Sequence, residues 1–338
     1  MEKSISQFKL ERTGIGFNPT ISASEAAEYA RQAENKGFDS FWVHENPFIK
    51  DAVSLLSVAI SATSKIRVGS GCVSVVTRHP LLATTTFVAL NQMSNGRVVM
   101  GVGLGGFPWL PKIGVKVFPV QETRPLRRIR EFLTIITGLL DGGPVNLDGE
   151  FYKVNNLKLD SKPSSKPSIY LAAFGPRLLS MAPEFVNGVI ISPAVMTPET
   201  TAPKVKVVHQ AASKRNRPVD IASYILTSVS KDEAEARRTT KSNYFLLYQV
   251  SEVLRSEVFE TYGLKEKDLE PIKEAWKRKD FAAAAKAMPD AVVEALTLTG
   301  NPDHCLERLK DYRKVGVDLP ILMPIGEIKT AFDTFGST

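Results

Sequence analysis

Three glycines near the end of the first third of the chain have a spacing that could bind a dinucleotide. Gly101, Gly103 and Gly106 fit the pattern G-x-G-x-x-G in the stretch GVGLGG. In a nicotinamide site this motif follows the first strand of an open sheet and opens a helix directly. Here three strand-like segments precede it, and the prolines of FPWLP, residues 107–111, hinder immediate helix entry. Glu122 lies near the distance expected for the acidic partner, but it begins a helix-like segment.

Two other interpretations of these glycines stay open. They could form a tight turn without a ligand. They could also lie at the carboxyl end of a barrel strand, where the backbone passes close to a flat ligand and any Cβ would collide with it.

The composition is typical of a globular protein. The chain has 338 residues, 43% hydrophobic and 23% charged, with a formal net charge of +7. Lys and Arg alternate with Glu and Asp in segments such as KDEAEARR, which is typical of solvated helix faces and does not favour nucleic-acid binding. Cys72 and Cys305 lie far apart, so neither a zinc site nor a redox pair is expected, and no metal is predicted. No apolar run predicts a signal core or a membrane span, so a cytoplasmic location is expected.

The length allows two ordinary domains or one large barrel, and the order of the elements favours the barrel. Strand-like segments alternate with helix-like ones. A (β/α)8 TIM barrel is therefore the predicted fold, as a single domain over residues 1–338 with a helical insertion over 231–298 before the last strand. Asp148-Gly149 predicts a small hairpin within residues 144–159. The eight expected strands are residues 12–17, 38–43, 65–76, 97–106, 167–175, 188–192, 219–229 and 317–326.

Several longer motifs resemble one known family. SNGRVVMGVGLGG, AAFGPRLLSMAPEFVNGVIIS and the segment from MPDAVVEALTLTG to ILMPIG are similar to the bacterial-luciferase-like superfamily. Within it, the sequence most resembles the deazaflavin-dependent methylenetetrahydromethanopterin reductases of archaea. The likeness runs from about Thr13 to the C-terminus, in the same order of motifs. It implies coenzyme F-420, an 8-hydroxy-5-deazaflavin with an anionic tail, at the carboxyl mouth of the barrel; relatives use FMN instead.

The resemblance also implies positions for the cofactor. Gly71-Cys72 matches the place where the family has a non-prolyl cis peptide that bulges against the ring; without the family, Cys72 would be interpreted as a buried thiol. Gly175-Pro176-Arg177 opens a helix, where free N–H groups and a guanidinium could hold a phosphate. Proline is also common at the first position of helices that bind no ligand. The full set expected to bind the cofactor is Gly71, Cys72, Ser74, Thr77, Gly103, Gly105, Gly106, Ala173, Gly175, Pro176 and Arg177.

The catalytic candidates follow the second strand. Glu45 and Asn46 occupy the place where the family often has Asp-His, so the carboxylate could orient the polar edge of the ring or exchange a proton. Asn46 has no titratable group in place of the family's histidine. His44, one position earlier, could supply such a group, or it could be a structural histidine. Ser74 and Thr77 could contact the ring or simply begin a helix. On strand one, Gly16 replaces the Glu of the reductases, which puts the pterin reaction in question.

These residues predict a deazaflavin-dependent oxidoreductase that transfers a hydride between C5 of the ring and an organic substrate. An FMN-dependent monooxygenase and a non-catalytic barrel are the alternatives. Small residues in AISATS and LLATTTFVAL could pack a homodimer or larger homo-oligomer, or the core alone. The expected partner is otherwise a small-molecule substrate, with no nucleic acid and no membrane.

Overall fold

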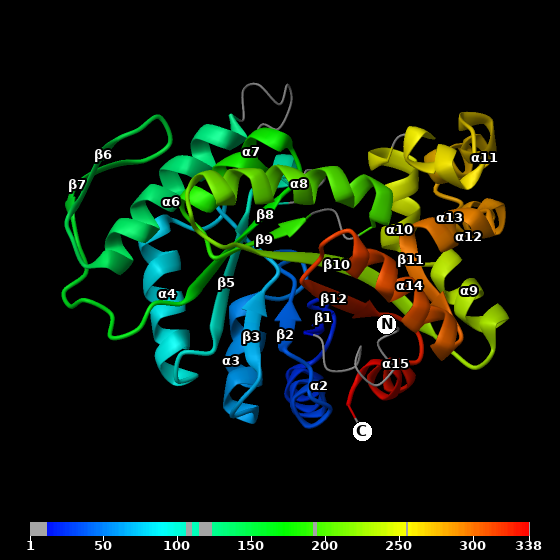
Figure 1. Cartoon of the computed structure of the whole chain (residues 1–338), viewed down its shortest axis with the longest axis horizontal. Coiled ribbons are helices and arrows are strands. Elements are labelled where there is room, and N and C mark those ends of the chain that lie inside the picture. Colours follow the sequence, from blue (N-terminus) through cyan, green and yellow to red (C-terminus); the bar gives the residue numbers. More distant parts are fainter. Residues whose placement is uncertain (1–11, 106–109, 115–123, 192–194, 255, 338) are drawn as a thin grey trace.

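The computed structural model describes residues 12–105, 110–114, 124–191, 195–254 and 256–337. Within these ranges, eight parallel strands pair side by side in the order β1, β2, β3, β5, β8, β9, β10 and β12, and β12 pairs back with β1. The sheet is thus a closed barrel, as predicted (Figure 1). The strands are β1 Gly14–Phe17, β2 Ser40–Val43, β3 Arg67–Ser70, β5 Val98–Gly103, β8 Ser168–Ala173, β9 Gly188–Ile191, β10 Asp220–Val229 and β12 Leu319–Pro324.

The third predicted strand is not continuous. It divides into β3 and the short β4, Val73–Ser74, with Gly71 and Cys72 between them. β3 pairs with β2 and β5, whereas β4 pairs with β5 alone. The chain therefore leaves the regular barrel wall at these two residues and returns to it beside the end of β5.

Helices with clear capping signals surround the barrel. Ser22 caps the helix after β1 in a reciprocal box with Glu25, and Asp51 caps the next helix by accepting a hydrogen bond from Ser54 N. Proline occupies the first turn of several helices, where no N–H partner is lost. The surrounding helices are α2 Ala23–Asn35, α3 Ala52–Ala62, α4 Pro80–Met93, α6 Pro125–Asp141, α7 Pro176–Met181, α8 Pro198–Lys214, α14 Pro302–Lys314 and α15 Ile328–Phe335.

Two excursions interrupt the alternation. β6, Val145–Asp148, and β7, Lys153–Leu157, form the antiparallel hairpin that Asp148-Gly149 predicted. Between β10 and β12, helices α9 to α13 gather on one side of the barrel (Figure 1). The expected helical run to residue 298 is wrong at its end, because Thr297 and Leu298 begin a strand, β11 Thr297–Gly300, that pairs with the end of β10. The helices are α9 Glu233–Lys241, α10 Tyr244–Tyr248, α11 Glu266–Lys277, α12 Phe281–Ala287 and α13 Asp290–Leu296.

The barrel has two apolar layers because successive strand residues face opposite sides. One set, including Phe41 and Leu171, packs between the strands and the outer helices. The other fills the barrel interior and includes Trp42, Tyr170 and Tyr224, each at most 5% exposed. The interior is thus a packed core, so a ligand has to bind at a rim.

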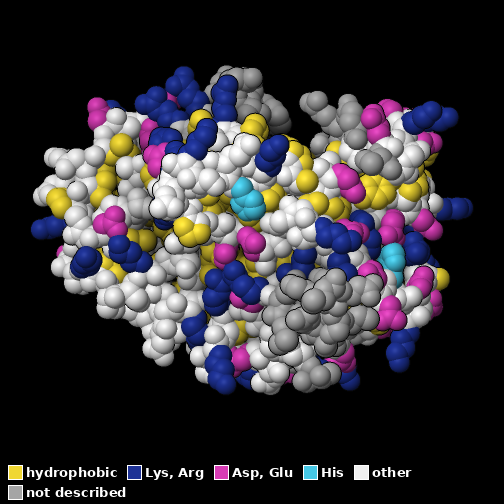
Figure 2. Space-filling model, viewed as in Figure 1, with side chains coloured by type: hydrophobic (Ala, Val, Ile, Leu, Met, Phe, Trp, Pro, Cys, Tyr) yellow, Lys and Arg dark blue, Asp and Glu magenta, His cyan; other side chains and the backbone are white. Residues whose placement is uncertain are grey.

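The outer surface mixes charges of both signs. Figure 2 shows Lys and Arg side chains dispersed among Asp and Glu on the face drawn. In the described part of the chain, no helix combines the length and the hydropathy that crossing a membrane would require.

Candidate functional site

The predicted site residues come from four neighbouring strands. Glu45 and Asn46 follow β2, Cys72 follows β3, Gly105 follows β5 and Gly175 follows β8. β2, β3, β5 and β8 are consecutive around the barrel, and all run in the same direction. Their carboxyl ends therefore form one continuous arc of the rim. Gly106 lies outside the described residues.

The peptide bond between Gly71 and Cys72 is cis, at the position where the family resemblance places such a bond. The Cys72 thiol points toward Gly103, because an ideal Cβ on Gly103 would lie 2.6 Å from Sγ. Burial, followed by the nearby charge of Glu45, raises the pKa of Cys72 to about 12. The thiol is therefore protonated at neutral pH and is unsuited to act as a nucleophile.

Glu45 is held from both sides. Its Oε1 accepts hydrogen bonds from Arg78 Nε at 3.1 Å and Nη2 at 2.5 Å, and its Oε2 accepts one from Ser74 N at 3.0 Å. Arg78 also bridges to Asp51, 2.5 Å away. The Glu45 side chain is only 7% exposed. This carboxylate joins the loops after β2 and β4, and a role for it in proton exchange stays a prediction.

The other polar candidates mostly bond to their own loops. Asn46 Oδ1 accepts from Phe48 N at 3.1 Å. Ser74 is 1% exposed, and its hydroxyl donates to Leu104 O at 2.6 Å. Thr77 donates to Ser74 O at 3.3 Å and is exposed. These bonds fix the shape of the rim, whereas direct contact of the three side chains with a ligand stays a prediction.

The first two glycines of the G-x-G-x-x-G motif serve close packing in the barrel wall. An ideal Cβ on Gly101 would lie 1.8 Å from the backbone oxygen of Ser70, and one on Gly103 would also meet Ala172 at 3.2 Å. β5, which carries both glycines, is the fourth strand of a closed barrel. The nicotinamide interpretation is therefore wrong, because that motif needs the first strand of an open sheet.

The turn after β8 combines an uncapped helix start with basic side chains. Gly175 is the N-cap of α7 and Pro176 its first residue, with no side chain capping the free N–H groups. Arg177 is exposed, and Ala173, at the end of β8, is 2% exposed. Lys204 of α8 reaches the same turn, with Nζ 4.4 Å from the centre of the Phe174 ring, and burial lowers its pKa.

Sequence reasoning missed Lys204 and Tyr224. Lys204 lies about thirty residues after the turn, inside a helix whose other lysines face solvent, and only the packing of α8 brings it there. Tyr224 reads as an ordinary strand tyrosine, yet its ring lies 4.3 Å from that of His44. No local sequence signal marks either residue.

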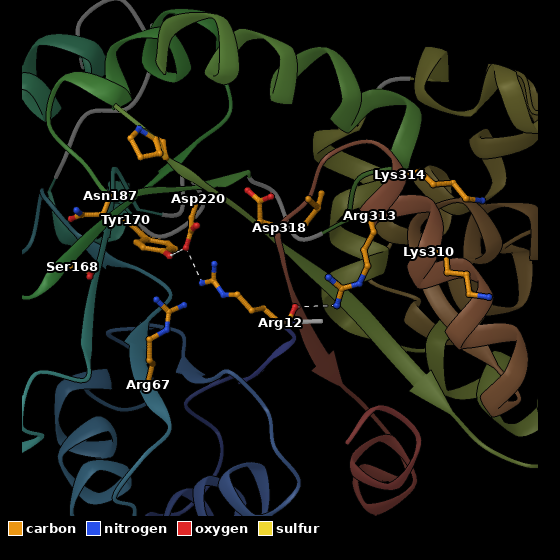
Figure 3. A pocket seen from close by; sticks show the side chains of 13 residues that line it. Arg12, Arg67, Ser168, Tyr170, Asn187, Asp220, Lys310, Arg313, Lys314 and Asp318 are labelled. Atoms are coloured by element: carbon orange, nitrogen blue, oxygen red, sulfur yellow. Dashed lines mark hydrogen bonds and ion pairs between the residues drawn. The ribbon is translucent and has the colours of Figure 1, made fainter. Parts of the chain in front are cut away.

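A hollow of about 940 Å³ lies at the other end of the barrel (Figure 3). Its lining includes Arg12, Arg67 and Asp220, which precede or begin strands, and Tyr170 in the first half of β8. Arg12 bridges to Asp39 and Asp220, each at 2.8 Å. These groups neutralise one another, and in barrel enzymes the amino-terminal end serves stability while chemistry occurs at the carboxyl end. We therefore place the functional site at the carboxyl rim.

A closed parallel barrel with its polar candidates on the carboxyl rim defines the class of (β/α)8-barrel enzymes. The chain belongs to the luciferase-like monooxygenase family, whose model matches residues 6–319. This confirms the family resemblance seen in the sequence, and the chain is an enzyme of this family.

Several relatives of this chain have named activities. The chain is 30% identical over 322 residues to 5,10-methylenetetrahydromethanopterin reductase of Archaeoglobus fulgidus, covering 94% of both proteins. It is 27% identical over 229 residues to an F-420-dependent glucose-6-phosphate dehydrogenase of Amycolatopsis mediterranei, covering 64% of this chain and 68% of the relative. The solved F-420-dependent tetrahydromethanopterin reductase of Methanopyrus kandleri superimposes with a TM-score of 0.85 at 26% identity, covering 96% of each chain.

Proposed function

We propose that this protein is an F-420-dependent oxidoreductase. The observation that carries the proposal is the end-to-end similarity to methylenetetrahydromethanopterin reductases, at 94% coverage of both chains. Relatives named for two different substrates, a pterin and a sugar phosphate, share F-420 in their names. When bound, this coenzyme exchanges a hydride at C5 of its ring with a carbon of an organic substrate.

The residues of the rim fit such a group. Gly101 and Gly103 let β5 pack closely against Ser70 and Cys72, which holds the Gly71-Cys72 segment against the barrel wall beside the proposed ring. The protonated Cys72 thiol adds no charge at that surface. The uncapped start of α7, with Arg177 and Lys204 beside it, would hold a phosphate by charge-assisted hydrogen bonds.

The proposal covers the reaction class and leaves out the pterin substrate, because Gly16 lies in a tight part of the barrel interior where a larger side chain would require its neighbours to shift. An ideal Cβ there would lie 3.1 Å from the ring of Tyr224 and 3.3 Å from atoms of Trp42 and Ile321. The family resemblance implies a glutamate at this position, and Gly16 supplies no carboxylate. We therefore propose an organic substrate other than methylenetetrahydromethanopterin.

The second candidate is an FMN-dependent monooxygenase. The matched family is named for monooxygenases, and an FMN-bound Baeyer-Villiger monooxygenase shares the fold with a TM-score of 0.69 at 17% identity. That candidate needs a flavin that reacts with molecular oxygen. A deazaflavin has carbon in place of the reactive nitrogen at position five and reacts poorly with oxygen.

Equilibrium titration of the purified protein with F-420 and with FMN tests the proposal. We expect tighter binding of F-420, and weaker binding after Arg177→Ala or Lys204→Ala because the phosphate loses a cation. Lys153→Ala, in the distant hairpin, is the matched control for the loss of one positive charge. Preference for FMN together with oxygen-dependent turnover would establish the monooxygenase instead, and binding of neither coenzyme would contradict the proposal.

We also propose that the protein acts in the cytoplasm as a homodimer. α4, one of the two helices whose small residues suggest packing between copies, exposes two large apolar side chains, Leu82 at 64% and Met93 at 55%. Burial of such side chains between copies would be favourable. Sedimentation velocity tests this, because Leu82→Glu should shift a dimer toward the monomer, whereas a wild-type protein that sediments as a monomer contradicts it.

A further inference from the structure

Tyr224 crosses the inside of the barrel. It lies on β10, which is four neighbours away from β3 in either direction around the eight-stranded ring of the described residues. β10 and β3 are therefore on opposite sides. The hydroxyl of Tyr224 nevertheless reaches the end of β3, since an ideal Cβ on Gly71 would lie 1.6 Å from that oxygen. Tyr224 thus fills the lumen beneath the rim and ends against Gly71.

The hydroxyl of Tyr224 is buried without a hydrogen-bond partner among the described residues. The same is true of Nε2 of His44, whose ring packs 4.3 Å from the tyrosine ring. Burial raises the pKa of Tyr224 well above its ordinary value and lowers that of His44 to about 4, so both groups are neutral. A buried polar atom without a partner costs folding free energy. Phenylalanine would avoid that cost, so stability does not explain the hydroxyl.

Gly71 is held from two directions. Its N–H donates to Val43 O at 2.8 Å on the side of β2. The hydroxyl of Tyr224 meets it from the lumen. Cys72, next in sequence, is close enough to Tyr224 for its charged form to raise the pKa of the phenol further. The position of this segment relative to the rim therefore depends on how far Tyr224 extends across the barrel.

We propose that Tyr224 is a positioning residue: its hydroxyl supports Gly71 from inside the barrel and sets the placement of the Gly71-Cys72 segment against which the coenzyme ring lies. The inference rests on the proposed function, because it assigns that segment to the ring. Tyr224 acts through Gly71 and does not contact the reacting carbon.

The test compares Tyr224→Phe with Tyr170→Phe. Both tyrosines lie inside the barrel and pack against Trp42, at 6.3 and 5.8 Å between ring centres. The hydroxyl of Tyr170, however, donates to Asp220 at the amino-terminal end of the barrel. Urea unfolding of the proteins without coenzyme, fluorescence titration with F-420 and the circular dichroism induced in bound F-420 are measured for both variants and the wild type.

We expect Tyr224→Phe to unfold at the same or a higher urea concentration than the wild type, to bind F-420 with an affinity within about threefold, and to lose the induced dichroism band. Binding is expected to persist because the phosphate contacts are untouched, whereas the ring orientation depends on the support under Gly71. Tyr170→Phe should unfold at lower urea because Asp220 loses a partner, and it should keep the band.

Two results would overturn the inference: an unchanged band in Tyr224→Phe with F-420 bound, or an unfolding midpoint lowered as much as in Tyr170→Phe. A different measurement, the titration of the wild type with F-420 and FMN, would contradict the proposed function. If the wild type prefers FMN, the same comparison made with FMN decides the role of Tyr224. A wild type that binds neither coenzyme overturns both proposals.

Discussion

At the scale of single residues, the part of the rim around the Gly71-Cys72 segment is built from neutral and neutralised groups. Glu45 is paired with Arg78, and the pKa values of Cys72 and Tyr224 are raised while that of His44 is lowered. Such a site carries little free charge beside the proposed ring. It suits hydride transfer, in which orientation and exclusion of water matter more than a strong acid or base.

His44 makes the stability of the fold depend on pH. Burial lowers its pKa from 6.5 to about 4, so between these values the unfolded chain binds a proton that the folded protein does not. The contribution of neutral His44 to the free energy of unfolding is complete above pH 6.5 and is lost as the pH falls toward 4. We expect urea midpoints of wild type and His44→Gln measured at pH 7.5, 6, 5 and 4.5 to converge on acidification, with the exposed His209→Gln as control. A difference that is constant over this range contradicts the prediction.

Arg78 is expected to stabilise the rim through Glu45. Arg78→Ala leaves a carboxylate that is 7% exposed without its cation, and loss of about 1–3 kcal/mol of unfolding free energy is expected. Arg78→Lys keeps the charge but not the two-pronged contact, so an intermediate loss is expected. Urea unfolding measures both. The exposed pair Lys153–Asp148 gives the control, since Lys153→Ala should produce no measurable change, and equal midpoints for Arg78→Ala and wild type would contradict the assignment.

At the scale of elements, β3 and β5 pack so closely that there is no room for a side chain at Gly101. Ser70 Oγ accepts from Gly101 N at 2.9 Å and donates to Gly101 O at 2.8 Å. The sequence predicts a strand in each of the two regions and shows the glycines at the end of the second one. It did not predict that the strand stops at Gly71, because β-branched residues continue the strand pattern through Val73 and Val75. The tertiary packing decides that β3 pairs with the first part of β5 and that β4 pairs with its end.

Gly101→Ala should therefore destabilise the barrel. The added Cβ would lie 1.8 Å from the backbone oxygen of Ser70, so the two strands must separate, at an expected cost of about 1–3 kcal/mol. Thermal unfolding followed by circular dichroism measures the loss. Gly143→Ala is the matched control because no atom lies within 4 Å of the added carbon. If both variants have the same unfolding temperature as the wild type, the prediction is wrong and the packing of β3 against β5 does not require glycine at residue 101.

At the scale of the whole molecule, the two ends of the barrel have different tasks. The carboxyl rim carries the proposed site. At the amino-terminal end, Arg12 and Arg67 form ion pairs with Asp39, and Arg12 also pairs with Asp220, as Figure 3 shows for the last pair. These four residues come from segments spread over most of the chain. Their pairing joins the first strands to β10 and so helps to close the barrel.

Asp39 makes that closure sensitive to acid. Burial alone would raise its pKa, but Arg67 and Arg12 outweigh burial and hold the pKa below its ordinary value of 3.8. The contribution of ionised Asp39 to the free energy of unfolding is therefore complete above about pH 4 and is lost as the pH falls through the lowered pKa. We expect Asp39→Asn to be less stable than the wild type at pH 7 in urea unfolding and the difference to shrink below pH 4. The exposed Asp160→Asn is the control, and a difference that grows on acidification would contradict the prediction.

The sequence by itself determined the eight barrel strands, the hairpin and the family, because these depend on local periodicity, turn residues and ordered motifs. The family resemblance named the candidate rim residues, and parallel strands bring their carboxyl ends together. Only the tertiary structure decided what those residues do for each other: that Glu45 binds Arg78, that Lys204 reaches the turn after β8, and that Tyr224 spans the barrel to Gly71. Such contacts join residues from different strands and helices, and nothing local in the chain encodes their distance.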